Sequence, residues 1–137
     1  MIKKRAYIDG VWDLFHIGHL KLFKKIKKKF GYLIVGVHSD KLATKSKRKP
    51  IIPHKDRAEI IKSIKYVDEV IENVPFLTLN LINKHNIEVV ATTNATAVTC
   101  NPKDKCALEK LKIFYEFKST KYHSSDIIKK INSKIRN

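Results

Sequence analysis

The run of apolar residues from Tyr32 to Val37 most constrains how this chain folds. The run has no alternating polar positions, so a strand formed from it must be buried on both faces, as strands are in a parallel sheet. Four further segments are expected to be strands, at 6–8, 67–71, 87–91 and 113–117. Between Tyr32 and the first strand, apolar residues recur at helical spacing over 17–30, and Gly31 fits the helix C-terminus.

The remaining segments complete an alternation of strands and helices. Helices are expected at 17–30, about 55–65, 77–85, 106–111 and 124–135, with a short helical turn after Ser39, a basic loop at 44–54 and a polar loop at 92–105. This order predicts an α/β fold, a doubly wound parallel five-stranded sheet with helices on both faces. No repeat or linker divides the 137 residues, so we expect a single domain, 1–137. Such sheets bind ligands beyond the carboxyl ends of their strands.

The net charge is strongly positive, +16 from 29 Lys and Arg against 13 Asp and Glu. A lysine-rich surface attracts phosphates, which makes nucleic acid one candidate partner. The cations are spread along the whole chain, however, and do not form one patch. We therefore expect a solvated basic surface first, attraction of small anionic substrates second, and binding to nucleic acid or acidic membranes last.

The sequence shows no targeting segment, and its two cysteines do not indicate a function. No apolar stretch approaches the ~18 residues of a membrane helix, and the basic N-terminus passes directly into a strand. Cys100 and Cys106 lack the spacing of a zinc site or a disulfide framework, and we interpret them as inert. A cytoplasmic protein without a transmembrane segment or a dedicated metal site is expected.

The segment from Asp9 to His19 carries the chemistry. It follows the first strand and opens the first helix, where Gly10 permits close approach of the backbone and free N–H groups face a phosphate. His16 and His19 share one helix face, and Gly18 between them leaves room for a phosphate chain. Two imidazoles on an anion suit stabilisation of a pentacovalent transition state and its leaving group.

The stretch G-V-W-D-L-F-H-I-G-H at 10–19 resembles the cytidylyltransferases that make CDP-choline, CDP-ethanolamine and CDP-glycerol, within the H-x-G-H nucleotidyltransferase superfamily. L-I-V-G-V-H-S-D at 33–40 and K-Y-V-D-E-V at 65–70 are similar to further family segments. The resemblance implies a Rossmann-like nucleotidyltransferase fold and transfer of CMP from CTP with release of pyrophosphate. It also implies Mg²⁺ accompanying CTP, and a homodimer with 67–70 near its interface.

The resemblance also implies individual roles. Lys47 falls on the lysine that bridges nucleotide and substrate phosphates and joins His16 and His19 as a catalytic residue. Arg57 is expected to hold the triphosphate or the loop of the site. The residues expected to bind CTP are Gly10, Val11, Trp12, His16, Gly18, His19, Arg57, Thr92, Thr93, Asn94, Lys118, Ser124 and Ser125.

Two segments depart from the family pattern. The fourth-strand motif H-x-D-D or H-G-N-D reads T-T-N-A at 92–95, and R-T-E-G-I-S-T reads K-S-T-K-Y-H-S at 118–124. Lys118 keeps the charge of Arg but not its fork, whereas Ser124 and Ser125 offer hydroxyls at a helix start. Three readings stay open: an active cytidylyltransferase, a weakened nucleotide-binding paralogue acting as a regulatory or partner subunit, and a related transferase with another nucleotide or acceptor.

The acceptor is expected to contact Asp9, Lys47 and Phe76. By resemblance, Asp9 is the counter-charge for an ammonium head and Phe76 an aromatic wall, which suits a cation. They favour phosphoethanolamine or phosphocholine over glycerol phosphate, with a slight preference for ethanolamine. Asp13 is expected to cap the first helix or to orient a histidine. The other histidines, His38, His54, His85 and His123, are expected on loops or helix ends.

Overall fold

The computed structural model describes residues 3–94, 100–119 and 123–136. Its elements in chain order are β1 (Lys4–Gly10), α1 (Ile17–Phe30), β2 (Gly31–His38), α2 (Asp40–Ser46), α3 (His54–Lys62), β3 (Glu69–Val74), α4 (Leu79–Lys84), β4 (Val89–Thr92), α5 (Lys105–Leu111), β5 (Phe114–Glu116) and α6 (Ser124–Arg136). The five strands form one sheet in the order β3-β2-β1-β4-β5, and every pair is parallel. The predicted doubly wound α/β fold is confirmed.

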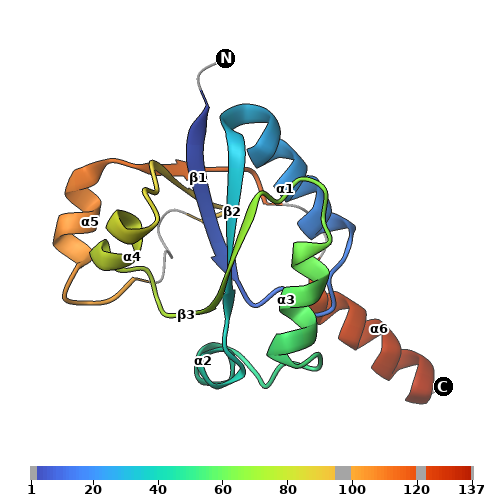
Figure 1. Cartoon of the computed structure of the whole chain (residues 1–137). Helices are drawn as coiled ribbons and strands as arrows, with labels where there is room; N and C mark the ends of the chain where they lie inside the picture. Colours follow the sequence, from blue (N-terminus) through green and yellow to red (C-terminus); the bar gives the residue numbers. More distant parts are fainter. Residues whose placement is uncertain (1–2, 95–99, 120–122, 137) are drawn as a thin grey trace.

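Two hydrophobic layers enclose the sheet. Figure 1 shows α1 and α3 on one side of it and α4 and α5 on the other. Along β2, Leu33 and Val35 pack toward the α1 and α3 side, whereas Ile34 between them packs toward the α4 and α5 side. All three are fully buried, which explains why the sequence of this strand shows no polar alternation.

Helix α1 ends as the sequence predicts. Gly31 has φ 83°, the left-handed conformation that glycine adopts without steric cost, and its N–H donates to the carbonyl of Lys27. The chain then enters β2 directly, in register with β1 from Lys4 opposite Gly31 to Gly10 opposite Val37. The carboxyl ends of the two central strands therefore meet at one edge of the sheet.

Some boundaries differ from the predicted ones. The loop expected at 44–54 begins as helix, because α2 runs to Ser46 after Ser39 caps its first turn through the N–H of Leu42. Strand β3 occupies 69–74 and not 67–71, since Val67 still donates to the carbonyl of Ile64 in the turn that follows α3. The first of these shifts lengthens the helical segment that leads into the basic loop.

Helix α6 buries none of its residues. In Figure 1 it extends away from the sheet beyond the end of α3. Ile131 and Ile135 are 50% and 77% exposed. Among the helices of the three described ranges, none has both the length and the apolar character needed to cross a bilayer.

Candidate active site

A cavity of about 570 Å³ lies at the carboxyl ends of the central strands. Its walls come from the turn after β1, the start of α1, the end of β2, the loop after α2, the end of β4 and the start of α6. Of the residues expected at the site, those that line it are Asp9, Gly10, Val11, Trp12, His16, Gly18, His19, Lys47, Phe76, Thr92, Thr93, Asn94, Ser124 and Ser125. The structure therefore gathers most of the predicted site in one place.

His16 and His19 form a rigid pair at the start of α1. The ring of His16 caps the helix, since its Nδ1 accepts the N–H of Gly18 at 3.0 Å. The Nδ1 of His19 accepts the N–H of His16 at 3.3 Å. The two rings are stacked, with centroids 3.8 Å apart. Both imidazoles are thereby fixed by the backbone before any ligand arrives.

These bonds also place the protons. A neutral imidazole has one donor and one acceptor nitrogen, and in both rings Nδ1 accepts, so we assign the proton to Nε2. Burial lowers the pKa of His19 to about 3, assisted by the nearby charges of His16, His123 and Lys47. Burial and His123 also lower the pKa of His16. The buried Nε2 of His16 has no hydrogen-bond partner among the described residues. At neutral pH the pair thus offers Nε2–H donors to an anion.

The turn between β1 and α1 is held in a strained conformation. Trp12 and Leu14 have φ values of 58° and 49°, in the left-handed region that side chains disfavour. The indole of Trp12 is buried and donates through Nε1 to the carbonyl of Gly36 at 2.9 Å. A Cβ on Gly10 would lie 2.8 Å from that indole, so glycine is required there. Trp12 meets the cavity as a buried wall residue.

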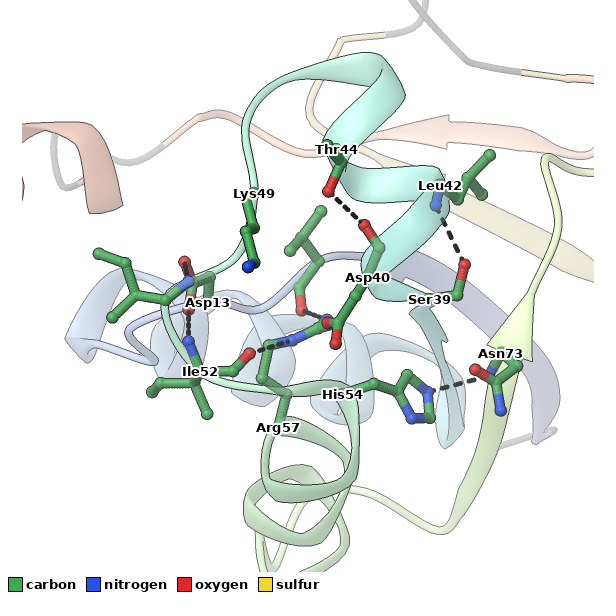
Figure 2. Close-up of polar contacts among 12 residues, drawn as sticks. Asp13, Ser39, Asp40, Leu42, Thr44, Lys49, Ile52, His54, Arg57 and Asn73 are labelled. Atoms are coloured by element: carbon green, nitrogen blue, oxygen red, sulfur yellow. Dashed lines mark hydrogen bonds and ion pairs between the residues drawn. The ribbon is translucent and has the colours of Figure 1, made fainter.

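Asp13 organises the loop that carries Lys47. Its Oδ1 accepts the N–H of Ile52 and its Oδ2 that of Ile51, each at 2.9 Å, while Arg48 donates to Oδ2 at 2.7 Å. Figure 2 shows Asp13 beside Ile52 of this loop. The backbone N–H bonds lower the pKa of this carboxyl, although burial opposes them. The expected role as a helix cap is wrong, because His16 caps α1.

Arg57 holds the same loop from the other side. Its side chain is fully buried and donates to the carbonyls of Ile52 and Val11 and, at 2.6 Å, to the carboxylate of Asp40 (Figure 2). Arg57 does not line the cavity. A direct contact with the triphosphate would require breaking these bonds, so we correct that expectation and assign Arg57 to the alternative role of fixing the site loop. Lys47 itself is exposed at the C-terminal end of α2 and lines the cavity.

The acceptor residues lie together. The Asp9 carboxylate is 28% exposed, and burial raises its pKa. The hydroxyl of Tyr7 donates to it across 3.5 Å, and His38 Nε2 is 3.8 Å away. The rings of His38 and Phe76 meet edge to face at 6.2 Å. His38, which was expected on a loop or a helix end, is instead the last residue of β2 and part of the cavity wall.

The two segments that depart from the family pattern, 92–95 and 118–124, contribute differently to the cavity. Thr92, Thr93 and Asn94 line the cavity, with Thr92 Oγ1 accepting the N–H of Asn94, while Ala95 lies outside the described residues. Ser124 donates to the carbonyl of Asp13 at 2.6 Å and thereby fixes the start of α6 at the site. Lys118 is exposed and does not line the cavity, so its role in CTP binding stays a prediction.

Besides Asp13 and His38, four further polar residues that were not predicted to bind a substrate line the cavity: Ser46, Arg48, Ser119 and His123. His123 lies just before Ser124, and only its position next to that helix start could have indicated it. For metal ions, no cluster of three or more His, Cys, Asp or Glu side chains occurs in residues 3–94, 100–119 and 123–136.

The site as a whole is built to hold phosphates. It combines neutral N–H donors on a helix start, a lysine on a loop and hydroxyls at a second helix start, at the carboxyl edge of a parallel sheet. The strand order and the position of the site are those of the Rossmann-like nucleotidyltransferase fold. Residues 7–131 match the family described as Cytidylyltransferase-like, and the chain belongs to that family.

Three comparisons place the chain among known proteins. It is 36% identical over 134 residues to choline-phosphate cytidylyltransferase 2 of Arabidopsis thaliana, covering 93% of this chain but 44% of that protein. It is 35% identical over 135 residues to FAD synthase of Pyrococcus abyssi, covering 93% of this chain and 91% of the synthase. In fold, it is similar to a lipopolysaccharide core biosynthesis protein of Thermoplasma volcanium, with a TM-score of 0.67, 23% identity, and 88% and 98% of the two chains covered. The chain thus spans less than half of its plant relative.

Proposed function

We propose that the protein transfers CMP from CTP to phosphoethanolamine or phosphocholine. One observation carries the choice of acceptor: the carboxylate of Asp9 and the ring of Phe76 lie on the wall of the cavity that also holds the histidine pair. A carboxylate beside an aromatic ring favours a cationic head group. The phosphate of such an acceptor then has the histidines and Lys47 within the same cavity.

The reaction needs no covalent intermediate. An oxygen of the acceptor phosphate attacks the α-phosphorus of CTP in line, a new P–O bond forms, and the bond to the β-phosphate breaks to release pyrophosphate. The Nε2–H groups of His16 and His19 donate to the phosphate oxygens as charge builds on them. Since both rings are neutral before the substrate binds, their strongest interaction is with the charge that develops during transfer.

The positive charge of Lys47 offsets the repulsion between the phosphate of the acceptor and the phosphates of CTP. It stands where α2 ends, and the loop after it is fastened by Asp13 and Arg57. A lysine on a fastened loop is held near the phosphates while its long side chain follows them through the reaction. We also propose that Mg²⁺ enters with the CTP phosphates as part of the substrate, and that the protein acts as a homodimer.

A second function has its own support. The chain covers 91% of the Pyrococcus abyssi FAD synthase, which is close to its own size. The same site chemistry would then transfer AMP from ATP to flavin mononucleotide. A half-buried carboxylate is a poor neighbour for a flavin ring without a cationic group, so we favour the amino alcohol.

The experiment is a product assay. The purified protein is incubated with Mg²⁺ and either CTP or ATP, together with phosphoethanolamine, phosphocholine, glycerol 3-phosphate or flavin mononucleotide, and the products are separated by chromatography. We expect a CDP-amino alcohol only with CTP. FAD from ATP would replace the proposal by the second function, equal use of glycerol 3-phosphate would refute the role of Asp9, and no product from any pair would indicate a weakened paralogue.

A further inference from the structure

His38 stands beside Asp9 at the acceptor end of the cavity. It is the last residue of β2, the strand that pairs with β1. Its Nδ1 lies 3.2 Å from the carbonyl oxygen of Val74. A carbonyl oxygen only accepts hydrogen bonds, so Nδ1 carries the proton of the neutral ring and Nε2 carries a lone pair. This tautomer is the opposite of the one we assign to His16 and His19.

The lone pair of His38 faces a second acceptor. Its Nε2 is 3.8 Å from Oδ1 of Asp9, with the two side chains 12% and 28% exposed. That separation exceeds the length of a hydrogen bond, so the two atoms are not bonded to each other. The hydroxyl of Tyr7 approaches the other carboxylate oxygen, Oδ2. Two acceptors therefore converge on one gap in the cavity wall.

A group that fills this gap must bring hydrogen-bond donors. A nitrogen about 2.9 Å from each acceptor fits, because 3.8 Å is less than twice that length. Phe76, whose ring contacts that of His38, adds an aromatic surface that favours positive charge. An ammonium group with at least two N–H bonds meets all three requirements.

We propose that His38 is a specificity-determining residue that, together with Asp9, selects a primary ammonium head group and excludes a quaternary one. This inference rests on the proposed function and narrows its acceptor to phosphoethanolamine. The ammonium of phosphoethanolamine donates to Asp9 Oδ1 and to His38 Nε2 at once. The trimethylammonium of phosphocholine has no N–H, so it leaves the lone pair of His38 without a donor.

The size of the selection follows from the bonds involved. A hydrogen bond with a charged partner changes a binding constant by about 10- to 100-fold. Asp9 attracts any cation, so the preference between the two acceptors comes mainly from His38 and the N–H bonds. We therefore expect kcat/KM for phosphoethanolamine to exceed that for phosphocholine by about 10-fold or more.

The test is internal competition between acceptors. Phosphoethanolamine is mixed in equal amounts with its N-methyl, N,N-dimethyl and N,N,N-trimethyl derivatives in turn, with CTP, and the ratio of products gives the ratio of kcat/KM. The monomethyl compound keeps two N–H bonds and should compete nearly equally. The value of kcat/KM should begin to fall with the dimethyl compound, which keeps one N–H bond, and should be lowest for phosphocholine, which has none.

His38→Leu, which removes the lone pair, should reduce the preference for phosphoethanolamine over phosphocholine to less than about 3-fold while leaving the KM for CTP unchanged. His85→Leu is the matched control, since His85 Nδ1 lies 3.7 Å from Glu69 and outside the cavity. It should keep the preference of the unaltered protein. Calorimetric titration of each acceptor into the protein without CTP should reproduce the order of affinities.

The outcomes separate this inference from the function on which it rests. CMP transfer to phosphocholine at least as efficient as to phosphoethanolamine overturns the role of His38 and keeps the proposed function. A preference for phosphoethanolamine over phosphocholine that is unchanged in His38→Leu also overturns the role of His38 and keeps the proposed function. If no CDP-amino alcohol forms and neither acceptor binds in the calorimeter, both are overturned. Binding of phosphoethanolamine that is lost in His38→Leu supports the inference even without turnover.

Discussion

Asp13→Asn should destabilise the protein although it changes only one atom of the side chain. In the native site, Oδ1 accepts the N–H groups of Ile52 and Leu14, and Oδ2 accepts Ile51 N–H and the guanidinium of Arg48. An amide has one oxygen, so in either orientation its NH₂ group faces two donors. The side chain is only 4% exposed, which leaves little room for water to take over.

The magnitude follows from those contacts. One buried backbone N–H without its acceptor costs about 1–3 kcal/mol, and loss of the carboxylate charge weakens the bonds that survive. We expect the free energy of unfolding to fall by about 2–4 kcal/mol in Asp13→Asn. Because the loop is loosened next to Lys47, kcat should fall as well, by about 10-fold.

Urea denaturation followed by circular dichroism measures the change in stability. Asp68→Asn is the matched control: Asp68 also accepts a backbone N–H, that of Leu33, and pairs with a lysine, Lys27. The single oxygen of the asparagine amide can take the place of Oδ2 and keep the bond from the Leu33 N–H. The free energy of unfolding should therefore fall by less than about 1 kcal/mol. If Asp13→Asn unfolds within about 0.5 kcal/mol of the unaltered protein, the reasoning about the loop is refuted.

Three further predictions concern the site. Lys47→Ala should lower kcat by about 100-fold, whereas Lys49→Ala, in the same loop, should lower it less than 3-fold in steady-state assays. The pKa of His19 is about 3 in the folded state and about 6.5 in the unfolded chain. Between these two pH values the unfolded chain binds a proton at His19 that the folded protein does not. Stability should therefore decline from pH 6.5 toward pH 3, and less steeply in His19→Asn, in thermal melts. Gly36→Ala would place a Cβ against the hydroxyl of Tyr7 and should cost about 1–3 kcal/mol of unfolding free energy; an unchanged melting temperature would contradict it.

Local patterns predicted the fold and the centre of the site well. Strand β2 and helix α1 follow from the apolar run and the helical spacing, and His16, Gly18 and His19 lie together because they occupy the N-cap and the first turn of α1. Their protonation was not predictable, because it depends on which ring nitrogen accepts a backbone N–H.

Long-range partners account for what the sequence did not reveal. Asp13 bonds N–H groups 38 and 39 positions away, and nothing in its own neighbourhood indicates them. His38 gains its tautomer from Val74 on the next strand. The pattern of charges also does not distinguish Arg57, fully buried, from Lys118, exposed and off the cavity wall.

The central claim is that the Nε2–H groups of His16 and His19 stabilise the transition state of nucleotidyl transfer. Asparagine at either position keeps an acceptor for the backbone N–H that Nδ1 now binds, and Asn is a favoured helix cap, but it lacks the Nε2–H donor. The decisive measurement is the rate of pyrophosphate release by His16→Asn and His19→Asn at saturating CTP and phosphoethanolamine. We expect kcat to fall by about 10²–10³-fold with the melting temperature nearly unchanged. Turnover within a few-fold of the unaltered protein in both variants would contradict the claim.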